Sequence, residues 1–202
     1  MTNTPFNATF VDPTIGDTHT ALWDWGDGTT AQGTVTEGNG SGSVTGSHAY
    51  GTPGVYTVVL TVTDRYEGSG QQIFQYVVVH DPNGGFVTGG GWIQSPAGAY
   101  GPDPALTGKA NVGFVAKFRK GSTVPTGNTQ FQTAGLNFQS TGYEWLVVSA
   151  AKAQYKGVGT INGAGTYGFL LTAIDGDSKG GGGIDRFRIK IWDPSANTVV
   201  YD

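Results

Sequence analysis

Three aspartates around a glycine-rich stretch are the residues in this sequence whose spacing is best suited to chemistry. Asp175 and Asp177 stand two residues apart at the end of an apolar run, and Asp185 opens the next run after four consecutive glycines. A hairpin would bring the three carboxylates near one another, with Asn162 and Asp103 as additional oxygen ligands. Ca²⁺ accepts about six to eight oxygens in loose geometry. Asp and Gly are also ordinary turn residues, so the stretch predicts either a calcium site or a solvated turn.

Flat aromatic side chains in the second half form another candidate surface. They are Trp92, Tyr100, Tyr143 and Trp145. Aromatic faces can stack on sugar rings, which would make these residues a polysaccharide-binding surface. Trp and Tyr also fill the cores of β-sandwiches because of their large apolar area. The residues therefore predict either a carbohydrate site or part of a core.

The residue types that catalysis needs do not gather anywhere in the sequence. Glycosidases need two opposed carboxylates, and the three glutamates, Glu37, Glu67 and Glu144, stand in no such setting. Cysteine is absent, so thiol nucleophiles and thiolate metal sites are excluded. Histidines 19, 48 and 80 lie in or near the first domain without zinc-site spacing. We expect no catalytic residues, and we interpret the chain as a protein that is not an enzyme.

One glycine motif matches a dinucleotide fingerprint in letters only. Residues 163–168 read Gly-Ala-Gly-Thr-Tyr-Gly. The fingerprint requires a helix whose N-terminus meets the pyrophosphate, whereas the apolar run at 169–174 is typical of a strand. We therefore predict a hairpin turn at 162–165 and no nucleotide site.

Composition narrows the class of protein. Charged residues make up 13% of the 202 residues, against about 25% in typical soluble domains, and the net charge is −4. This balance argues against nucleic acid and anionic membranes as partners. Hydrophobic residues make up 37%, enough for substantial cores, but no apolar run is long enough for a membrane span. No secretory leader precedes the domain-like sequence, so we interpret the chain as a segment of a longer protein.

The hydrophobic pattern predicts strands throughout. At 55–63, for example, apolar residues alternate with threonines, which is the period of a half-buried strand. Turn signals recur every ~8–12 residues, as in antiparallel sandwiches. The predicted strands are 6–11, 21–25, 29–36, 44–50, 55–63, 73–79, 86–93, 111–119, 130–139, 143–149, 153–161, 166–174, 184–192 and 198–201.

Three sequence blocks in the first half resemble a PKD domain. They are Trp23-Asp24-Trp25-Gly26-Asp27-Gly28, then Ser47-His48-Ala49-Tyr50, then the strand with its flanking residues at 53–64. The resemblance covers about residues 4–80. It implies an immunoglobulin-like sandwich that serves as an extracellular spacer, adhesion or substrate-presenting module. Few residues precede Trp23, so the family's first strand is expected to be truncated, which leaves an exposed edge that another chain could pair with.

The resemblance also implies a second calcium site. Some PKD domains bind calcium near aspartates that correspond to Asp24, Asp27 and Asp64. The tryptophans of the first block are expected in the core. His48 is interpreted as a structural imidazole bonded to backbone or to the Asp27 turn, with a metal ligand as the alternative.

The second half resembles a β-rich module that often follows PKD domains in bacterial and archaeal secreted proteins. The matching stretches are 84–93, 106–111 and 187–193. A short proline-containing junction at 80–85 precedes it, so the two domains are expected to pack together. The module has no established activity, so the resemblance supplies context and no mechanism.

The sequence thus predicts an all-β protein with two β-sandwich domains in tandem. Residues 1–81 are the immunoglobulin-like PKD sandwich, and residues 82–202 are an antiparallel, jelly-roll-like sandwich. The predicted function is a non-catalytic structural or adhesive module of a larger prokaryotic protein, extracellular or at the cell surface, stabilised by calcium. Its expected partners are neighbouring domains, and polysaccharide or another surface protein. The alternative is a carbohydrate-binding accessory module of a secreted hydrolase.

Overall fold

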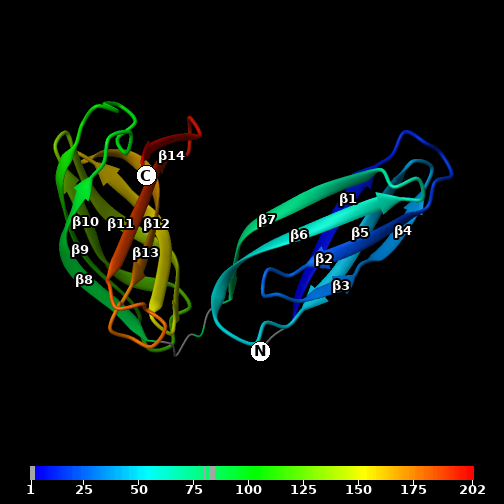
Figure 1. The fold of residues 1–202 in the computed structure, drawn as a ribbon, viewed down its shortest axis with the longest axis horizontal. Helices are drawn as coiled ribbons and strands as arrows, with labels where there is room; N and C mark the ends of the chain where they lie inside the picture. Colours follow the sequence, from blue (N-terminus) through cyan, green and yellow to red (C-terminus); the bar gives the residue numbers. More distant parts are fainter. Residues whose placement is uncertain (1–2, 80, 82–84) are drawn as a thin grey trace. The chain divides into compact units, whose positions relative to one another are not determined.

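A computed structural model of the protein describes residues 3–79, 81 and 85–202 (Figure 1). The described residues form strands, turns and loops and contain no helix, which confirms the all-β class. Two compact units, Met1–Val79 and His80–Asp202, divide the chain. Residues 80 and 82–84 of the expected junction lie outside the described residues.

The first unit is a sandwich of two antiparallel sheets with orders β1-β5-β4 and β3-β2-β6-β7. Its strands are β1 (Thr4–Val11), β2 (His19–Asp24), β3 (Thr30–Gln32), β4 (Thr34–Gly38), β5 (Ser41–His48), β6 (Gly54–Asp64) and β7 (Ser69–Val79). The first strand, β1, pairs over its whole length with β5. It is the outer strand of its sheet, and its other side has no strand partner among the described residues.

The alternating tryptophans form the centre of this sandwich. Trp23 and Trp25 are 0% and 1% exposed, and their rings stack 5.3 Å apart. Strand alternation places both on the inner face and Asp24 on the outer face. The Tyr50 hydroxyl donates to the Trp25 carbonyl oxygen at 3.1 Å and fixes the strand end. The prediction that the tryptophans lie in the core is confirmed.

The predicted strand at 29–36 is wrong, because the chain changes sheets in its middle. β3 and β4 lie in opposite sheets and are separated by Gly33. The Gly33 N–H donates to the Ala21 carbonyl oxygen at 2.8 Å. A Cβ at this position would lie 2.6 Å from Val44 and 2.9 Å from Trp23 Nε1, so the crossing needs a residue without a side chain.

The second unit contains one eight-stranded antiparallel sheet with the order β15-β14-β13-β12-β11-β10-β9-β8. Its strands are β8 (Phe86–Ser95), β9 (Gly108–Phe118), β10 (Pro125–Thr133), β11 (Leu136–Ser149), β12 (Lys152–Ile161), β13 (Ala164–Ile174), β14 (Arg186–Asp193) and β15 (Thr198–Tyr201). Each strand pairs with its neighbour in sequence. This meander is simpler than the jelly-roll connections that we expected.

The meander curls so that its two ends face each other across one core. Phe131 on β10 contacts Tyr201 on β15, with 4.6 Å between ring centroids. Phe114 on β9 stacks on Phe187 of β14 at 6.0 Å. One buried cluster joins residues from strands across the sheet. The tandem sandwich organisation is therefore confirmed.

Two strand boundaries in this unit differ from the prediction. A turn with Gly135 at φ +80° interrupts the predicted strand at 130–139 and separates β10 from β11. The predicted strand at 143–149 is the second half of β11, which continues through two irregularities, between Ser140 and Gly142 and between Tyr143 and Trp145. Such irregularities let a long strand bend around the core.

The hairpin predicted in place of a nucleotide site is confirmed. β12 and β13 pair up to Ile161 and Ala164, with Asn162 and Gly163 at positive φ in the turn. Adjacent left-handed residues are the geometry that a tight two-residue hairpin requires. No helix N-terminus meets this turn in the described part of the chain.

Candidate functional site

An acidic cluster lies at one end of the first sandwich. Carboxylate oxygens of Asp12, Asp17 and Asp64 lie within 4.8 Å of one another. Asp12 and Asp17 belong to the β1–β2 connection, and Asp64 ends β6. The pairing of β2 with β6 places His19 directly opposite Asp64 and so brings the loop and the strand end together. Asp12 also lines a hollow of about 520 Å³ beside the cluster.

The buried member of this cluster is Asp17. Its side chain is 4% exposed, and its Oδ1 has no hydrogen-bond partner among the described residues. Arg65 Nε lies 3.1 Å from that oxygen, but the contact is not aligned as a hydrogen bond. Burying a carboxylate is costly unless it is paired and hydrogen-bonded. The side chain thus keeps an electrostatic partner and an unused acceptor oxygen.

Cations flank the cluster without neutralising it. His19 contacts Asp12 Oδ2 at 2.9 Å and Glu37 Oε2 at 2.7 Å. Burial lowers the pKa of His19, but the bonds to the two carboxylates raise it more, so the net pKa is above its usual value. Four carboxylates, on residues 12, 17, 37 and 64, face His19 and Arg65. Even with His19 protonated, the group carries two net negative charges, which is the charge that one divalent cation balances.

The remaining oxygens of the cluster hold the local backbone. Asp64 Oδ1 accepts from the N–H groups of Tyr66 and Gly68 at 2.7 and 3.0 Å. Asp12 Oδ1 accepts from the Thr14 N–H at 2.6 Å. This bond and the contact with His19 lower the pKa of Asp12. The Asp12 and Asp64 carboxylates are thus held in position by turns.

The sequence-predicted group of Asp24, Asp27 and Asp64 does not form one site. Asp24 pairs with Val59 at one end of β2, while Asp64 pairs with His19 at the other end, about 17 Å away at the strand rise. Asp24 and Asp27 instead stabilise the turn between β2 and β3. Asp24 accepts from the Gly26 N–H at 2.9 Å, and Asp27 accepts from the Thr29 N–H at 3.1 Å. Asp64 belongs instead with the loop aspartates.

The structural interpretation of His48 is confirmed. Its Nε2 lies 2.7 Å from Asp27 Oδ2, and its ring stacks on Trp25 at 5.1 Å. The pKa of Asp27 is lowered to about 2, chiefly by the Thr29 hydroxyl and then by His48. The imidazole therefore links the turn to the core.

In the second unit, the loop of Asp175, Asp177 and Asp185 holds itself together with its own carboxylates. Asp175 accepts from the Ser178 hydroxyl at 2.8 Å and from the Asp177 N–H at 3.0 Å. These bonds lower its pKa. Asp185 Oδ1 accepts from the Gly176 N–H at 2.8 Å. The three residues do not come together as a close group of metal ligands.

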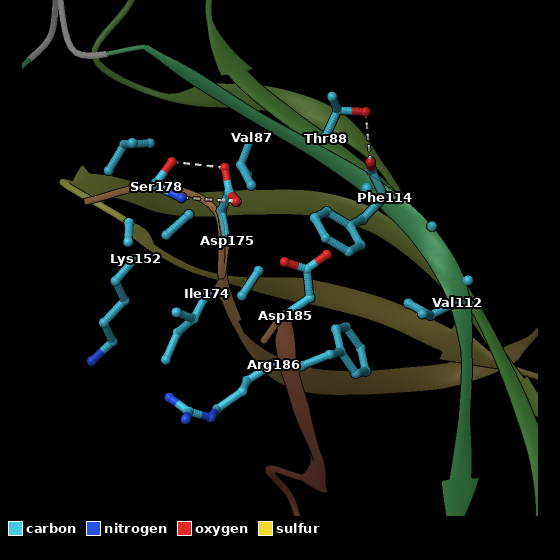
Figure 2. Close-up of a pocket in the computed structure, with 18 of the residues that line it drawn as sticks. Val87, Thr88, Val112, Phe114, Lys152, Ile174, Asp175, Ser178, Asp185 and Arg186 are labelled. Carbon is cyan, nitrogen blue, oxygen red and sulfur yellow. Dashed lines mark hydrogen bonds between the residues drawn. The ribbon is translucent and has the colours of Figure 1, made fainter. Parts of the chain in front are cut away.

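This loop borders a groove of about 710 Å³, lined by β8, by the β11–β12 turn and by the ends of β13 and β14. Figure 2 shows the Asp185 carboxylate directed towards Phe114, while Lys152 and Arg186 extend away from it. The groove floor is formed by apolar side chains such as Val87, Val112 and Phe114. Its geometry offers an apolar floor and a rim that carries two carboxylates, Asp175 and Asp185, and two cations, Lys152 and Arg186.

The four predicted carbohydrate-binding aromatics are not gathered on one platform. Trp92 is 63% exposed beside the groove. Tyr143 instead joins an interior network, with its hydroxyl 2.8 Å from Thr129 Oγ1. Tyr100 pairs with β15 through its backbone, and Trp145 is half-buried in β11.

Comparison with known proteins identifies the first unit. The family model of the PKD domain matches residues 1–79. Residues 1–79 form a PKD domain. No curated protein and no solved structure matches the chain. PKD domains are non-catalytic, typically extracellular structural or adhesive modules within longer multidomain chains. Among the described residues, no helix has the length and apolarity to cross a membrane.

Sequence reasoning missed Asp12 and Asp17 as members of the acidic cluster of the PKD domain. Both lie in the loop before β2 and are far in sequence from Asp64. Local spacing therefore carries no signal of their proximity. The signal that could have found them is the pairing of two predicted strands, because an antiparallel β2–β6 register places the loop before β2 beside the end of β6.

Proposed function

We propose that this chain is a non-catalytic structural or adhesive segment of a longer extracellular protein, stabilised by calcium in its PKD domain. The family match over residues 1–79 is the observation that carries the proposal. It is supported by the two packed cores, which absorb most of the large side chains. Antiparallel sandwiches of this kind resist shear along their strands and can set the spacing between neighbouring domains.

The calcium part of the proposal assigns the ion to Asp12, Asp17 and Asp64. Support comes from the unused Asp17 oxygen and from the two net negative charges of the cluster. Carboxylate oxygens on a loop fit the loose geometry that Ca²⁺ accepts. Arg65, whose side chain is 53% exposed, would turn out to solvent when the ion binds. The loop of Asp175, Asp177 and Asp185 is less suited, because its three carboxylates do not come together as a close group.

Calcium should raise the melting midpoint of the PKD domain, because a ligand that binds only the folded state stabilises it. We expect the midpoint to rise with millimolar Ca²⁺ and to return with excess EDTA, as measured by differential scanning calorimetry. The variant D17N should remove the calcium-dependent shift. The matched variant D177N, in the other acidic loop, should retain it.

Unchanged midpoints in Ca²⁺ and EDTA would refute the calcium site and leave the structural role of the PKD domain standing. Loss of the shift in D177N instead of D17N would move the ion to the second unit. The alternative function, a carbohydrate-binding accessory module, rests on the exposed Trp92 beside the groove. Binding to an insoluble polysaccharide that W92A abolishes would support it.

A further inference from the structure

The two outer strands of the second unit differ in how they are protected. The edge of β15 is covered by the β8–β9 connection. In it, Gly101 N–H donates to the Val200 carbonyl oxygen at 2.9 Å, and Asp202 N–H donates to the Ala99 carbonyl oxygen at 3.0 Å. The other outer strand, β8, has no strand partner beyond β9 among the described residues. One edge of the sheet is therefore open.

The open edge lacks the features by which proteins usually prevent strand pairing. Such features are charged side chains, prolines, bulges and short length. β8 contains no charged residue and no proline, and its ten residues pair with β9 without a register shift. It is a long, regular and neutral edge strand, which is a template for a further strand.

The glycines of β8 point to the approach of another backbone. Gly89 has an internal reason, since a Cβ there would lie 2.6 Å from the Phe114 ring. No contact within this chain requires glycine at position 91, because an added Cβ there would meet nothing within 4 Å. Glycine in a strand interior weakens the strand and often marks a place where another chain comes close. The fold of one copy does not account for Gly91.

The two large exposed side chains of β8 are placed symmetrically about Gly89. Phe86 lies three residues before it and Trp92 three residues after it, and each is 63% exposed. Both share the outer face, while Val87 and Ile93 pack against the core. Read in the opposite direction, the strand therefore presents the same spacing of aromatic rings.

We propose that β8 pairs antiparallel with β8 of a second copy of this chain, with the two-fold axis at Gly89. In this register Phe86 of each copy lies directly opposite Trp92 of the other. Two cross-strand aromatic pairs then form on the outer face, a contact that stabilises antiparallel strands. Two-fold contacts require such a self-complementary surface, and the eight-stranded sheets join into one continuous sheet.

The charges beside β8 are compatible with a second copy. The groove rim carries Asp175 and Asp185 together with Lys152 and Arg186, so its formal charge sums to zero although the chain carries −4. Lys109 Nζ, from the neighbouring strand β9, lies over the Trp92 ring at 5.5 Å from its centroid. Two copies can therefore meet at this surface without the electrostatic repulsion that their net negative charges would otherwise cause.

Sedimentation equilibrium of the 202-residue chain tests the proposal. We expect a reversible dimer whose Kd weakens at least about tenfold in W92K, because the substitution removes both cross-strand aromatic pairs. The control is I184K, which changes an equally exposed side chain (68%) away from the strand and should leave the Kd unchanged. A monomer at all concentrations up to about 1 mM, or equal weakening by both variants, would overturn the proposal.

Cysteine pairing tests the register, since the chain has no cysteine of its own. Directly opposed strand residues have Cα atoms about 4.5–5.5 Å apart, within disulfide range. An oxidised equal mixture of F86C and W92C should therefore give covalent dimers. In each mixed dimer the two cysteines face each other, and the other cross-strand pair is still Phe86 with Trp92. F86C alone should give none, because its sulfurs would lie about 20 Å apart. Dimers with F86C alone, or none in the mixture, would refute this pairing.

Discussion

At the scale of single residues, carboxylates in this protein hold turns more often than they face ligands. Asp27 shows the pattern, since it bonds the backbone and hydroxyl of Thr29 and the ring of His48. The latter contact extends through stacking to Trp25 in the core. Asp17 is the exception, because one of its oxygens is buried without a hydrogen bond. This contrast separates a structural aspartate from a candidate ligand.

Asp27 should make the PKD domain sensitive to acid. Its folded pKa of about 2 lies below the ordinary value of 3.8, so its stabilisation is present above about pH 4 and is lost as the pH falls towards 2. D27A should lower the free energy of unfolding by about 2 kcal/mol at pH 7, and by less at pH 2. Urea unfolding at the two pH values measures this. An equal loss at both would contradict the assignment.

At the scale of elements, a single glycine decides how the first sandwich is built. Gly33 lets the chain leave one sheet after β3 and enter the other as β4. Its position beside Val44 and the Trp23 ring leaves no room for a side chain. The crossing therefore depends on packing between the sheets as well as on local conformation.

G33A should destabilise the PKD domain by about 3 kcal/mol, because the added methyl overpacks the core at the crossing. The matched control is G38A, on the following strand, where an added Cβ meets nothing within 4 Å. Urea unfolding followed by the fluorescence of the buried tryptophans measures the difference. Equal stability of the two variants would show that the crossing can relax around a methyl group.

Most strands were predictable because their side chains alternate, as in β6 and β14. The sheet change at Gly33 was not predictable, since it depends on packing against Val44 and the Trp23 ring, which are close in space but distant in sequence. The turn at Gly135 was missed because apolar residues flank it on both sides. The acidic cluster was missed because only the β2–β6 register brings Asp64 to Asp17. Local pattern thus predicts elements, and contacts between strands create sites.

At the scale of the whole molecule, the two units have separate cores. Trp23, Trp25 and their neighbours form one cluster, and the phenylalanines and tyrosines of the curled sheet form the other. The two clusters share no residue. Each unit thus has the buried apolar surface that an independently folding domain needs.

Calorimetry of the chain should therefore show two unfolding transitions. G33A should lower only the transition of the PKD domain, because its overpacking is confined to that core. L171A, at a fully buried position of β13, should lower only the other by about 2–5 kcal/mol. A single transition that moves with either substitution would show that the domains unfold as one cooperative unit.

The interior tyrosines limit how alkaline a solution the fold can withstand. Burial raises the pKa of Tyr50 to about 12 and also raises that of Tyr155, whose hydroxyl lies 2.9 Å from Thr129 Oγ1. The unfolded chain loses these protons near pH 10. Above that pH, deprotonation of each phenol therefore favours unfolding of the domain that buries it. Deprotonation of these phenols in the unfolded chain, which the folded cores oppose, therefore lowers the stability of both units at high pH.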